Sequence, residues 1–385
     1  MGNFNNQINR IITILMCSFS CFSFAQPDVN TEKQVRLVFN QLISVYGSAK
    51  PQPKLEFVEK GKFPVQPARY SPKPIPKIEI DVALYKLCQT FGKDSLNALA
   101  VVLSHELTHY YNDHTFCSDY AFANFKANAE LQKKIGQASY NARIEKESEA
   151  DIKGFFYAAS AGFQPYGLQR LLIGKIYTTY KLSDIQKGYP TKQERIDIAI
   201  KAEKTATQLY EYFKSGLTAL ENKQYDQAID FFNKANSQVP FRENWNNIGV
   251  AYARKALNLK LPSKAEADNA NRFLYPLEIE NKSRLLNERT RSIDDTTEEM
   301  QKLLNEAQNA FEKALQLAPS FHKSRINLAC VYDLQGKHNS AIAEITEKLP
   351  VEARASNEAK RILAIAYWNA DMEDKAEKIW RELKM

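Results

Sequence analysis

The residues with the clearest chemical potential lie between Ser104 and His109, where the chain reads Ser-His-Glu-Leu-Thr-His. His105 and His109 are four residues apart, so on a helix both imidazoles lie on one face and reach the same metal ion. Glu106 then points toward the remaining coordination position, where a water binds. Zinc lowers the pKa of such a water to roughly 7, and the carboxylate takes its proton as the water attacks a carbonyl. The motif therefore predicts a zinc site with His105 and His109 as ligands and Glu106 as general base.

The sequence around this motif predicts a buried helix. Asp94 and Ser95 are residue types that cap helix N-termini. Apolar side chains follow at helical spacing, and residues 98–103 are apolar almost all round, as in a helix inside a core. The alternative is an amphipathic helix whose histidines are satisfied by hydrogen bonds alone.

A second helical stretch, residues 147–158, supplies a third ligand. Glu147 and Asp151 are four residues apart and share a helix face. Small side chains continue this face and would let the helix lie close against the first one: Ala150, Gly154 and Ala158. Glu147 would then complete a site of two histidines and one glutamate, with Asp151 accepting a hydrogen bond from a ligand imidazole. Glu149, on a different face, is the rival ligand, and an ordinary solvated surface is the alternative.

These two motifs in this order resemble those of zincin metallopeptidases of the HtpX, CAAX prenyl protease and BepA type. The resemblance covers roughly residues 54–200. It implies a helix-rich α+β zinc metalloendopeptidase domain, one zinc ion per chain and polypeptide substrates. The E-x-x-x-D pattern of the family selects Glu147 over Glu149 as the ligand.

The loop before the next helix departs from that family. The resemblance places a His-Pro pair here, with an arginine six residues after the histidine, whereas this chain has Tyr189, Pro190 and Arg195. A phenol is a poor zinc ligand but donates a hydrogen bond well. We therefore expect Tyr189 to leave the metal accessible and to donate to the tetrahedral intermediate, with Arg195 anchoring the loop or the substrate carbonyl. A tyrosine that only packs is the alternative.

Two further expectations concern the surroundings of the site. Residues 77–81 alternate in polarity after a proline-rich stretch and predict an edge strand. In zincins an edge strand above the metal holds the substrate extended by main-chain pairing, a role we assign to Ile78 and its neighbours. His114 follows a predicted helix end, off the face of the two ligands, and is expected to be a surface histidine.

The N-terminal residues 1–25 are typical of a secretory signal, with a short apolar core and a small-residue cleavage site before Gln26. They predict export, most simply into a bacterial periplasm, of a mature chain without a transmembrane segment. An uncleaved anchor, or lipidation at Cys17 or Cys21, is the alternative. Export permits a disulfide between Cys88 and Cys117, and separate buried thiols, as expected for Cys330, are equally compatible with the sequence.

Composition and length indicate a globular protein of two or more domains: 385 residues, 44% of them hydrophobic and 25% charged, with a net charge of +7. Lysine and arginine are scattered, so the mild basicity does not indicate a nucleic-acid interface.

From Thr205 onward the pattern changes to that of tetratricopeptide (TPR) repeats, which predicts an all-α solenoid of about four helix pairs. The first repeat matches at Tyr212, Gly216, Ala228, Phe232, Ala235 and Pro240, and the second begins at Trp245, Ile248, Gly249 and Tyr252. Its second helix arrives late, at Ala307, Phe311 and Ala314, after an insertion at about residues 256–300. The expected division is a signal peptide (1–25), a metallopeptidase domain (26–204) that folds by itself, and a repeat domain (205–385).

These features together predict an exported zinc endopeptidase acting on envelope or misfolded proteins. The repeats would recruit clients or partners, and the resemblance implies an association with the outer membrane and its assembly machinery. The alternative is a TPR scaffold or chaperone whose metal site is vestigial or self-inhibited. Proteolysis by the wild type and none by Glu106→Gln would separate the two.

Overall fold

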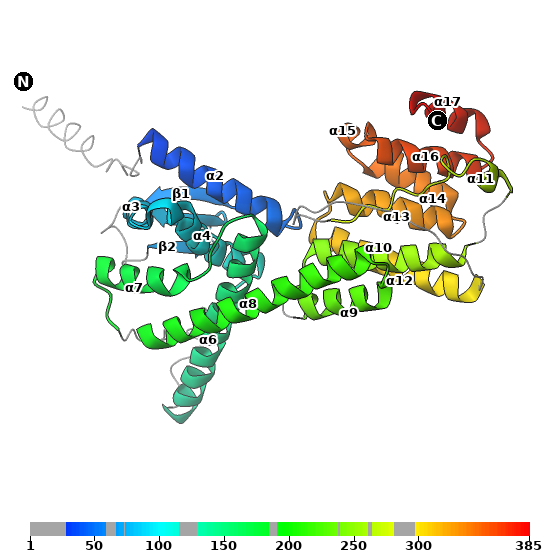
Figure 1. Cartoon of the computed structure of the whole chain (residues 1–385). Helices are drawn as coiled ribbons and strands as arrows, with labels where there is room; N and C mark the ends of the chain where they lie inside the picture. The colour runs from blue at the N-terminus through cyan, green and yellow to red at the C-terminus, as the bar shows by residue number, and fades with distance from the viewer. Residues whose placement is uncertain are drawn as a thin grey trace, which may run out of the picture.

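The computed structural model describes residues 28–58, 67–72, 74–114, 129–184, 191–237, 239–260, 264–280 and 297–385. The expected signal peptide, Cys117 and Tyr189 lie outside these ranges. Helices dominate the described residues and form two regions of different construction (Figure 1). None of the helices in these ranges is both long enough and apolar enough to cross a bilayer.

The first region combines a small sheet with helices packed around it. Its elements, in chain order, are α2 (Val29–Tyr46), β1 (Lys54–Val58), β2 (Ala68–Ser71), β3 (Lys77–Asp81), α3 (Val82–Gln89), α4 (Ser95–Tyr111), α6 (Ala129–Ser160) and α7 (Leu168–Tyr180). The N-terminus of α2 is capped by Asp28, whose carboxylate accepts a hydrogen bond from the Thr31 amide at 2.9 Å. Asp81 caps α3 in the same way, through the Ala83 amide at 3.0 Å.

The sheet has the order β1-β3-β2, with β1 parallel and β2 antiparallel to β3. Ile78 on β3 pairs with Leu55 on one side and with Tyr70 on the other. The expectation that Ile78 lies on an edge strand is therefore wrong: β3 is the central strand. Among the described residues, β1 and β2 are the two edge strands. The strand β2 lies within the proline-rich stretch, whose sequence did not reveal it.

The helix of the His-Glu-Leu-Thr-His motif, α4, is buried along most of its length, as its apolar sequence predicted. Helix α2 is fixed to it by Tyr46, whose hydroxyl lies 2.6 Å from the Thr108 hydroxyl and donates to the Ser104 carbonyl. The Tyr46 ring stacks on Tyr111 with 4.8 Å between centroids. This contact holds the two helical turns that carry the histidines.

Helix α6 approaches α4 very closely, as the run of small residues predicted. Ala150 and Ala158 are fully buried, and a Cβ atom added at Gly154 would lie 2.9 Å from the backbone nitrogen of His105. Only a residue without a side chain permits this approach. The absence of a side chain at Gly154 therefore brings the carboxylates of α6 within reach of the histidines.

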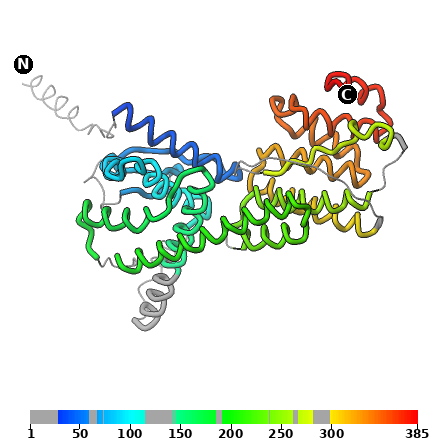
Figure 2. Tube along the Cα trace, viewed as in Figure 1, coloured from blue at the N-terminus to red at the C-terminus, as the bar shows by residue number. Residues whose placement is uncertain are grey.

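The long helix α8 (Lys192–Glu221) belongs to both regions (Figure 2). It starts with a capping box between Thr191 and Glu194, next to the site, and ends inside the repeat stack. The domain boundary expected at residue 205 thus falls inside one continuous helix. Phe156 of α6 packs against Phe241 at the base of the stack, with 4.7 Å between ring centroids, so the core of the repeats extends into the first region.

The second region is a stack of helix pairs. Its helices are α9 (Tyr225–Asn236), α10 (Arg242–Leu259), α11 (Lys264–Asp268), α12 (Thr297–Leu317), α13 (His322–Leu334), α14 (His338–Ala343), α15 (Val351–Arg354), α16 (Asn357–Asn369) and α17 (Glu373–Glu382), with a π-helical turn at Glu344–Lys348. The pairs are α8 with α9, α10 with α12, α13 with α14, and α16 with α17. The late second helix expected around Phe311 is α12, and the insertion lies between α10 and α12.

Within a pair, the helices touch where a glycine faces a large ring. A Cβ atom at Gly216 would lie 2.5 Å from the ring of Phe232, and one at Gly249 would lie 2.6 Å from the ring of Phe311. Both rings are fully buried. The same contact between a glycine and a phenylalanine of the repeat pattern therefore packs the helices of the first two pairs.

A second junction joins the regions at the C-terminal end of α2. Gly47 has a φ of 92° and packs against the Leu317 carbonyl at the end of α12. Next to it, the Ser48 hydroxyl lies 2.7 Å from that of Ser320, and the Arg242 guanidinium donates to the Ser44 carbonyl at 2.8 Å. The first region thus contacts the stack both through α8 and through this turn.

Candidate metal centre

The three predicted ligands converge at one place between α4 and α6. The Nε2 atoms of His105 and His109 are 3.0 Å apart. The carboxylate of Glu147 lies 3.4 Å from the first of these nitrogens and 3.6 Å from the second. Among the described residues, these three side chains form the group of histidine and carboxylate ligands that can hold a metal ion.

The arrangement fits a zinc ion. Ligand atoms at 2.0–2.1 Å from a tetrahedral ion are separated from one another by about 3.3–3.4 Å. The two imidazole nitrogens are 3.0 Å apart, and each lies 3.4 or 3.6 Å from a different oxygen of Glu147; one ligand atom from each residue lies within 4.8 Å of the others. Three protein ligands also leave one position open, as in catalytic rather than structural zinc sites.

Asp151 lies against His105, the first predicted ligand. Its carboxylate lies 2.8 Å from Nδ1 of His105, and its side chain is almost completely buried. A carboxylate on Nδ1 keeps the proton there, so the lone pair of Nε2 points toward Glu147 and His109. Asp151 therefore sets the direction from which His105 can bind a cation.

His114 orients the second ligand, so the expectation that it is a surface histidine is wrong. Its side chain is only 6% exposed, and its Nδ1 lies 2.8 Å from Nδ1 of His109. The helix ends as expected, but Asp113 has a φ of 54° and turns the chain back, so that the His114 amide donates to the His109 carbonyl at 3.1 Å. A residue that tolerates the left-handed conformation at a helix C-terminus is the sequence signal that was missed.

Glu149, the rival ligand, belongs to this second support. One carboxylate oxygen lies 3.2 Å from Nε2 of His114, and the other accepts a hydrogen bond from Asn112 at 3.0 Å. With the proton of His114 on Nε2, its Nδ1 accepts from His109 and leaves Nε2 of His109 directed at the site. Asp151 thus holds the imidazole of His105, and Glu149 holds the imidazole of His114.

Arg195 from α8 pairs with the carboxylates of α6. One of its terminal nitrogens lies 2.6 Å from the Glu147 carboxylate, and the other lies 3.4 Å from Asp151. The sequence predicted a role for Arg195 at the loop or at the substrate carbonyl. The structure instead places its guanidinium against a ligand and against the residue that orients another ligand, and this contact links α8 to the site.

Glu106 points toward β2. Its carboxylate accepts a hydrogen bond from the main-chain amide of Tyr70 at 2.8 Å. That amide therefore faces away from β3, and the outer edge of β2 lies beside the acid that the motif assigns as general base. Burial raises the pKa of Glu106 above its ordinary value, which suits a group that must take up a proton near neutral pH.

The charges of the site favour a cation. Burial disfavours the charged form of His105, but the hydrogen bond and the charge of Asp151 outweigh it and raise the pKa of His105 to about 10. Burial lowers the pKa of His109 to about 3, and the charge on His105 contributes in the same direction. Burial alone would raise the pKa of Glu147, yet Arg195 and the two imidazoles hold it well below the ordinary value. The protein thus stabilises one positive charge among these groups.

The remaining predicted residues lie elsewhere. Tyr189 is outside the described residues, so its expected role as a hydrogen-bond donor stays a prediction. Cys88 and Cys330 are free, buried thiols, and burial raises the pKa of Cys88 to about 12. Cys117, the expected disulfide partner of Cys88, is outside the described residues.

Comparison with protein families matches residues 212–237 to the tetratricopeptide repeat. This range covers the end of α8 and all of α9, the first helix pair of the stack, and confirms the TPR part of the sequence prediction. A search of curated proteins finds no match to this chain. A helix-rich chain with a TPR repeat indicates a role in binding other proteins.

Proposed function

We propose that this protein is a zinc-dependent endopeptidase of the zincin type whose TPR repeats recruit its polypeptide clients or partners. The observation that carries the proposal is the convergence of His105, His109 and Glu147, with Glu106 beside them. The support of both imidazoles by Asp151 and His114 favours a metal site over a chance group of polar side chains.

The division of work follows from the geometry. A zinc ion held by His105, His109 and Glu147 would polarise the substrate carbonyl and acidify a water. Glu106 takes the proton of the attacking water and returns it to the leaving amine. Arg195 neutralises part of the charge on Glu147 and fixes its carboxylate for binding. Tyr189 would donate a hydrogen bond to the oxyanion, a contact worth roughly a hundredfold or more in turnover.

The substrate would lie along the outer edge of β2. The Tyr70 amide on that edge is already turned toward Glu106. An extended peptide that adds to this edge as a further strand brings its carbonyl groups past the general base. The role first assigned to Ile78 thus passes to β2, because β3 is covered on both sides.

Export and an outer-membrane setting are part of the same proposal. They rest on the N-terminal signal pattern and on the family resemblance, which implies clients among envelope or misfolded proteins and partners in the assembly machinery. Retention of the protein in the cytoplasm of its own cells would contradict this part of the proposal.

The proposal is tested with an unfolded protein substrate. Wild type should hydrolyse it and carry about one zinc per chain, whereas Glu106→Gln should keep the zinc and lose roughly 10²–10⁴-fold in turnover. Glu145→Gln, an exposed position on α6, is the matched control and should behave as wild type. Equal turnover of wild type and Glu106→Gln would refute an enzymatic role.

The second candidate is a TPR scaffold or chaperone with a vestigial or self-inhibited metal site. It is favoured by the match of the repeat to a known family and by the hydrogen bond that Glu106 makes to the chain's own strand. A scaffold would bind clients equally well with and without zinc and would hydrolyse none of them.

A further inference from the structure

Part of the insertion lies as an extended segment on the repeat stack. We call residues Arg272–Glu280 the groove segment; it is neither helical nor part of a sheet (Figure 1, yellow-green). Its first two residues belong to a turn, and the Leu277 amide donates to the Tyr275 carbonyl at 2.9 Å, so the chain bends at Pro276. Its buried apolar side chains alternate, at Phe273, Tyr275 and Leu277. The segment lies on the face formed by α10, α13 and α16, the first helices of the second, third and fourth pairs; this surface is called the inner face below.

Two asparagines on the inner face bind the main chain of the groove segment. Asn327 donates to the Glu278 carbonyl at 2.9 Å and accepts from the Glu278 amide at 2.8 Å. Asn247 donates to the Glu280 carbonyl at 3.0 Å and accepts from the Glu280 amide at 2.9 Å. Each carboxamide thus pairs with both main-chain groups of one residue, as a neighbouring β-strand would. Residues two apart on an extended chain present these groups on the same edge.

The two asparagines occupy the same place in consecutive repeats. Asn247 is five residues before Tyr252 in the second repeat, and Asn327 is five residues before Tyr332 in the third. The spacing between these two asparagine–main-chain pairs, called the asparagine ladder below, is therefore set by the repeat. Asn246 supports it, because it donates to the Glu278 carbonyl at 3.0 Å and accepts from Asn327 at 3.0 Å.

These polar groups are completely buried: Asn246, Asn247, Ser324 and Asn327 have no exposed surface. A buried carboxamide without partners costs roughly 1–3 kcal/mol. With the groove segment in place, all three carboxamides donate to carbonyl groups of its main chain. Because the three asparagines bond the groove segment only through its main chain, another chain with the same backbone geometry could take its place.

Side chains add selectivity to this ladder. Phe273 packs against Trp368 and Trp380, with 5.9 and 5.5 Å between ring centroids. The Tyr275 hydroxyl donates to Asp333 at 2.7 Å. At the other end, the ammonium of Lys323 lies 3.6 Å from Glu280 and 3.8 Å from Glu278. The inner face thus binds aromatic side chains at positions 273 and 275 and acidic side chains at positions 278 and 280.

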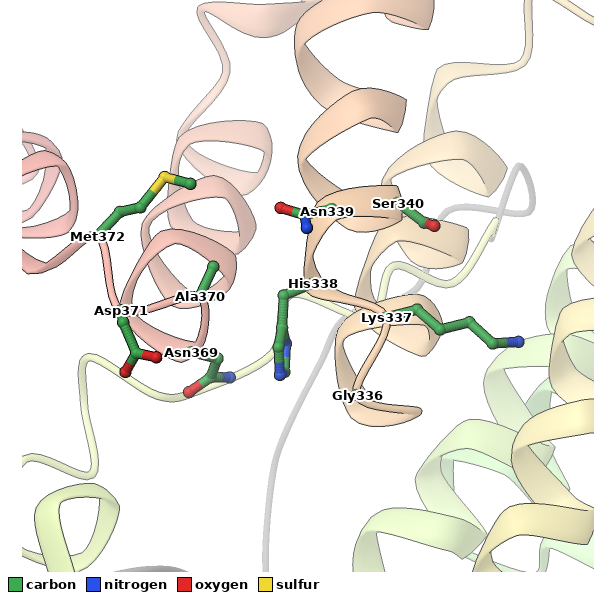
Figure 3. Close-up of a pocket in the computed structure, with 9 residues that line it drawn as sticks. All are labelled: Gly336, Lys337, His338, Asn339, Ser340, Asn369, Ala370, Asp371 and Met372. Carbon is green, nitrogen blue, oxygen red and sulfur yellow. The ribbon is translucent and has the colours of Figure 1, made fainter.

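The Asp333 contact is itself supported by two turns of the stack. Asn369 donates to Asp333 at 2.8 Å, and His338 lies 2.6 Å from it. Both side chains line an open hollow of about 440 Å³ between the turn before α14 and the turn after α16 (Figure 3). The carboxylate that binds the Tyr275 hydroxyl is therefore held in place by residues of the third and fourth helix pairs.

We propose that the inner face is the site that binds an extended segment of a client protein, and that the groove segment occupies it in cis as a competitor. The client segment carries two aromatic residues and then two acidic ones, each pair at alternate positions. The proposal rests on the recruiting role of the repeats and not on hydrolysis. Helices α10 and α12 pack directly on each other, and the Gly249–Phe311 contact between them does not involve the groove segment.

Competition in cis sets the expected size of the effect. A segment tethered to its own site acts at an effective concentration of the order of millimolar and suppresses binding of a free peptide by about 10²–10⁴-fold. A full chain that keeps the groove segment should therefore bind a free copy of it weakly, and a chain without it should bind tightly.

The test uses a fluorescent peptide of residues 271–281 and the full chain carrying Glu106→Gln, with fluorescence polarisation as the measurement. Replacing residues 261–296 by about six glycine and serine residues, a usual length for a helix–helix connection, should lower the Kd at least 100-fold. Adding Asn247→Ala and Asn327→Ala to that chain should raise the Kd at least tenfold. Because Glu106 is already replaced, failure of the protease proposal does not affect this result.

Modified peptides make the test specific for the ladder. N-methylation at Glu278 and Glu280 removes the two amide protons that the asparagines accept, and should abolish binding. N-methylation at Ile279, whose amide lies on the other edge, is the matched control and should be tolerated. Equal binding of the two modified peptides overturns the proposal.

A milder variant covers the case in which the replaced chain does not fold. Phe273→Ala with Tyr275→Ala weakens the segment within the intact insertion and should increase peptide binding about tenfold. Folded variants that bind no peptide overturn the proposal, as does loss of folding in both variants, which would make the segment a structural element. Exchange of the segment between two copies, seen as a wild-type dimer by light scattering, overturns it as well.

Discussion

The metal centre and the inner face of the repeats are built with similar means but are completed differently. Gly154 brings α6 against α4 at the metal centre, and Gly249 packs α10 against α12 in the stack. Both places carry buried polar side chains, those of the inner face being the asparagines of α10 and α13. At the inner face, the polar groups are paired with the main chain of the groove segment. At the metal centre, the nitrogens of His105 and His109 face each other and a carboxylate, and their other nitrogens are already occupied.

This difference indicates which kind of ligand each region takes. Two imidazole nitrogens and a carboxylate that converge suit a cation, which would displace the proton that His105 otherwise holds. Carboxamides that alternate donor and acceptor require a polypeptide. The two regions therefore differ in the ligand each one suits, and α8 runs from one to the other.

The largest expected effect concerns the metal. His105→Ala or Glu147→Ala should reduce bound zinc from about one per chain to none after dialysis, since each change removes one of three ligands. Hydrolysis should disappear with it, while the peptide affinity of the inner face stays the same. Metal analysis of the purified proteins measures the effect. Glu149→Ala is the control and should keep zinc at saturating concentration; the reverse result would transfer the ligand role to Glu149.

The next effect tests whether the regions are independent. Ending the chain at residue 204 cuts α8 and exposes Phe155 and Phe156 of α6. Exposing a phenylalanine costs about 1.5–3 kcal/mol, so the fragment should lose about 3–6 kcal/mol of unfolding free energy relative to a chain ending at residue 260, which keeps α8 and Phe241. Urea denaturation measures both. Equal stability would restore the expectation of a self-sufficient first domain.

A smaller effect concerns the support of the second ligand. His114→Ala removes the partner of His109, and loss of such a partner lowers metal affinity about 10–100-fold. Competition with a zinc chelator measures the change in Kd. His322→Ala, an exposed histidine of the repeat stack, should leave the Kd unchanged. An unaltered Kd in His114→Ala would mean that Asp151 alone orients the site.

The smallest effect compares the two glycine contacts directly. Gly154→Ala and Gly249→Ala each force a methyl group to within 3 Å of buried atoms and should cost about 1–3 kcal/mol of unfolding free energy. Only Gly154→Ala should also weaken zinc binding, because its added methyl group would collide with the backbone of His105. Gly174→Ala, on an open face of α7, should stabilise the protein by up to about 1 kcal/mol. Weaker zinc binding in Gly249→Ala would show that the regions are coupled.

Much of the metal centre was predicted from sequence because its residues are paired locally. Spacing of four on a helix places His105 with His109, and Glu147 with Asp151, before any tertiary contact forms. The same holds for the repeats, in which glycine and phenylalanine recur at fixed distances. His114 was missed because its position depends on the left-handed residue Asp113, which turns the chain back onto the helix.

The sequence by itself determined which side chains share a face of each element, because helical and strand periods are properties of the local backbone. It thereby defined the candidate ligands of α4 and α6 and the spacing of the repeats. Tertiary structure decided which elements meet: that Arg195 reaches Glu147 from α8, that β3 lies between β1 and β2, and that Glu278 and Glu280 pair with Asn327 and Asn247. These contacts join residues far apart in the chain, and their partners are selected by packing across the whole fold.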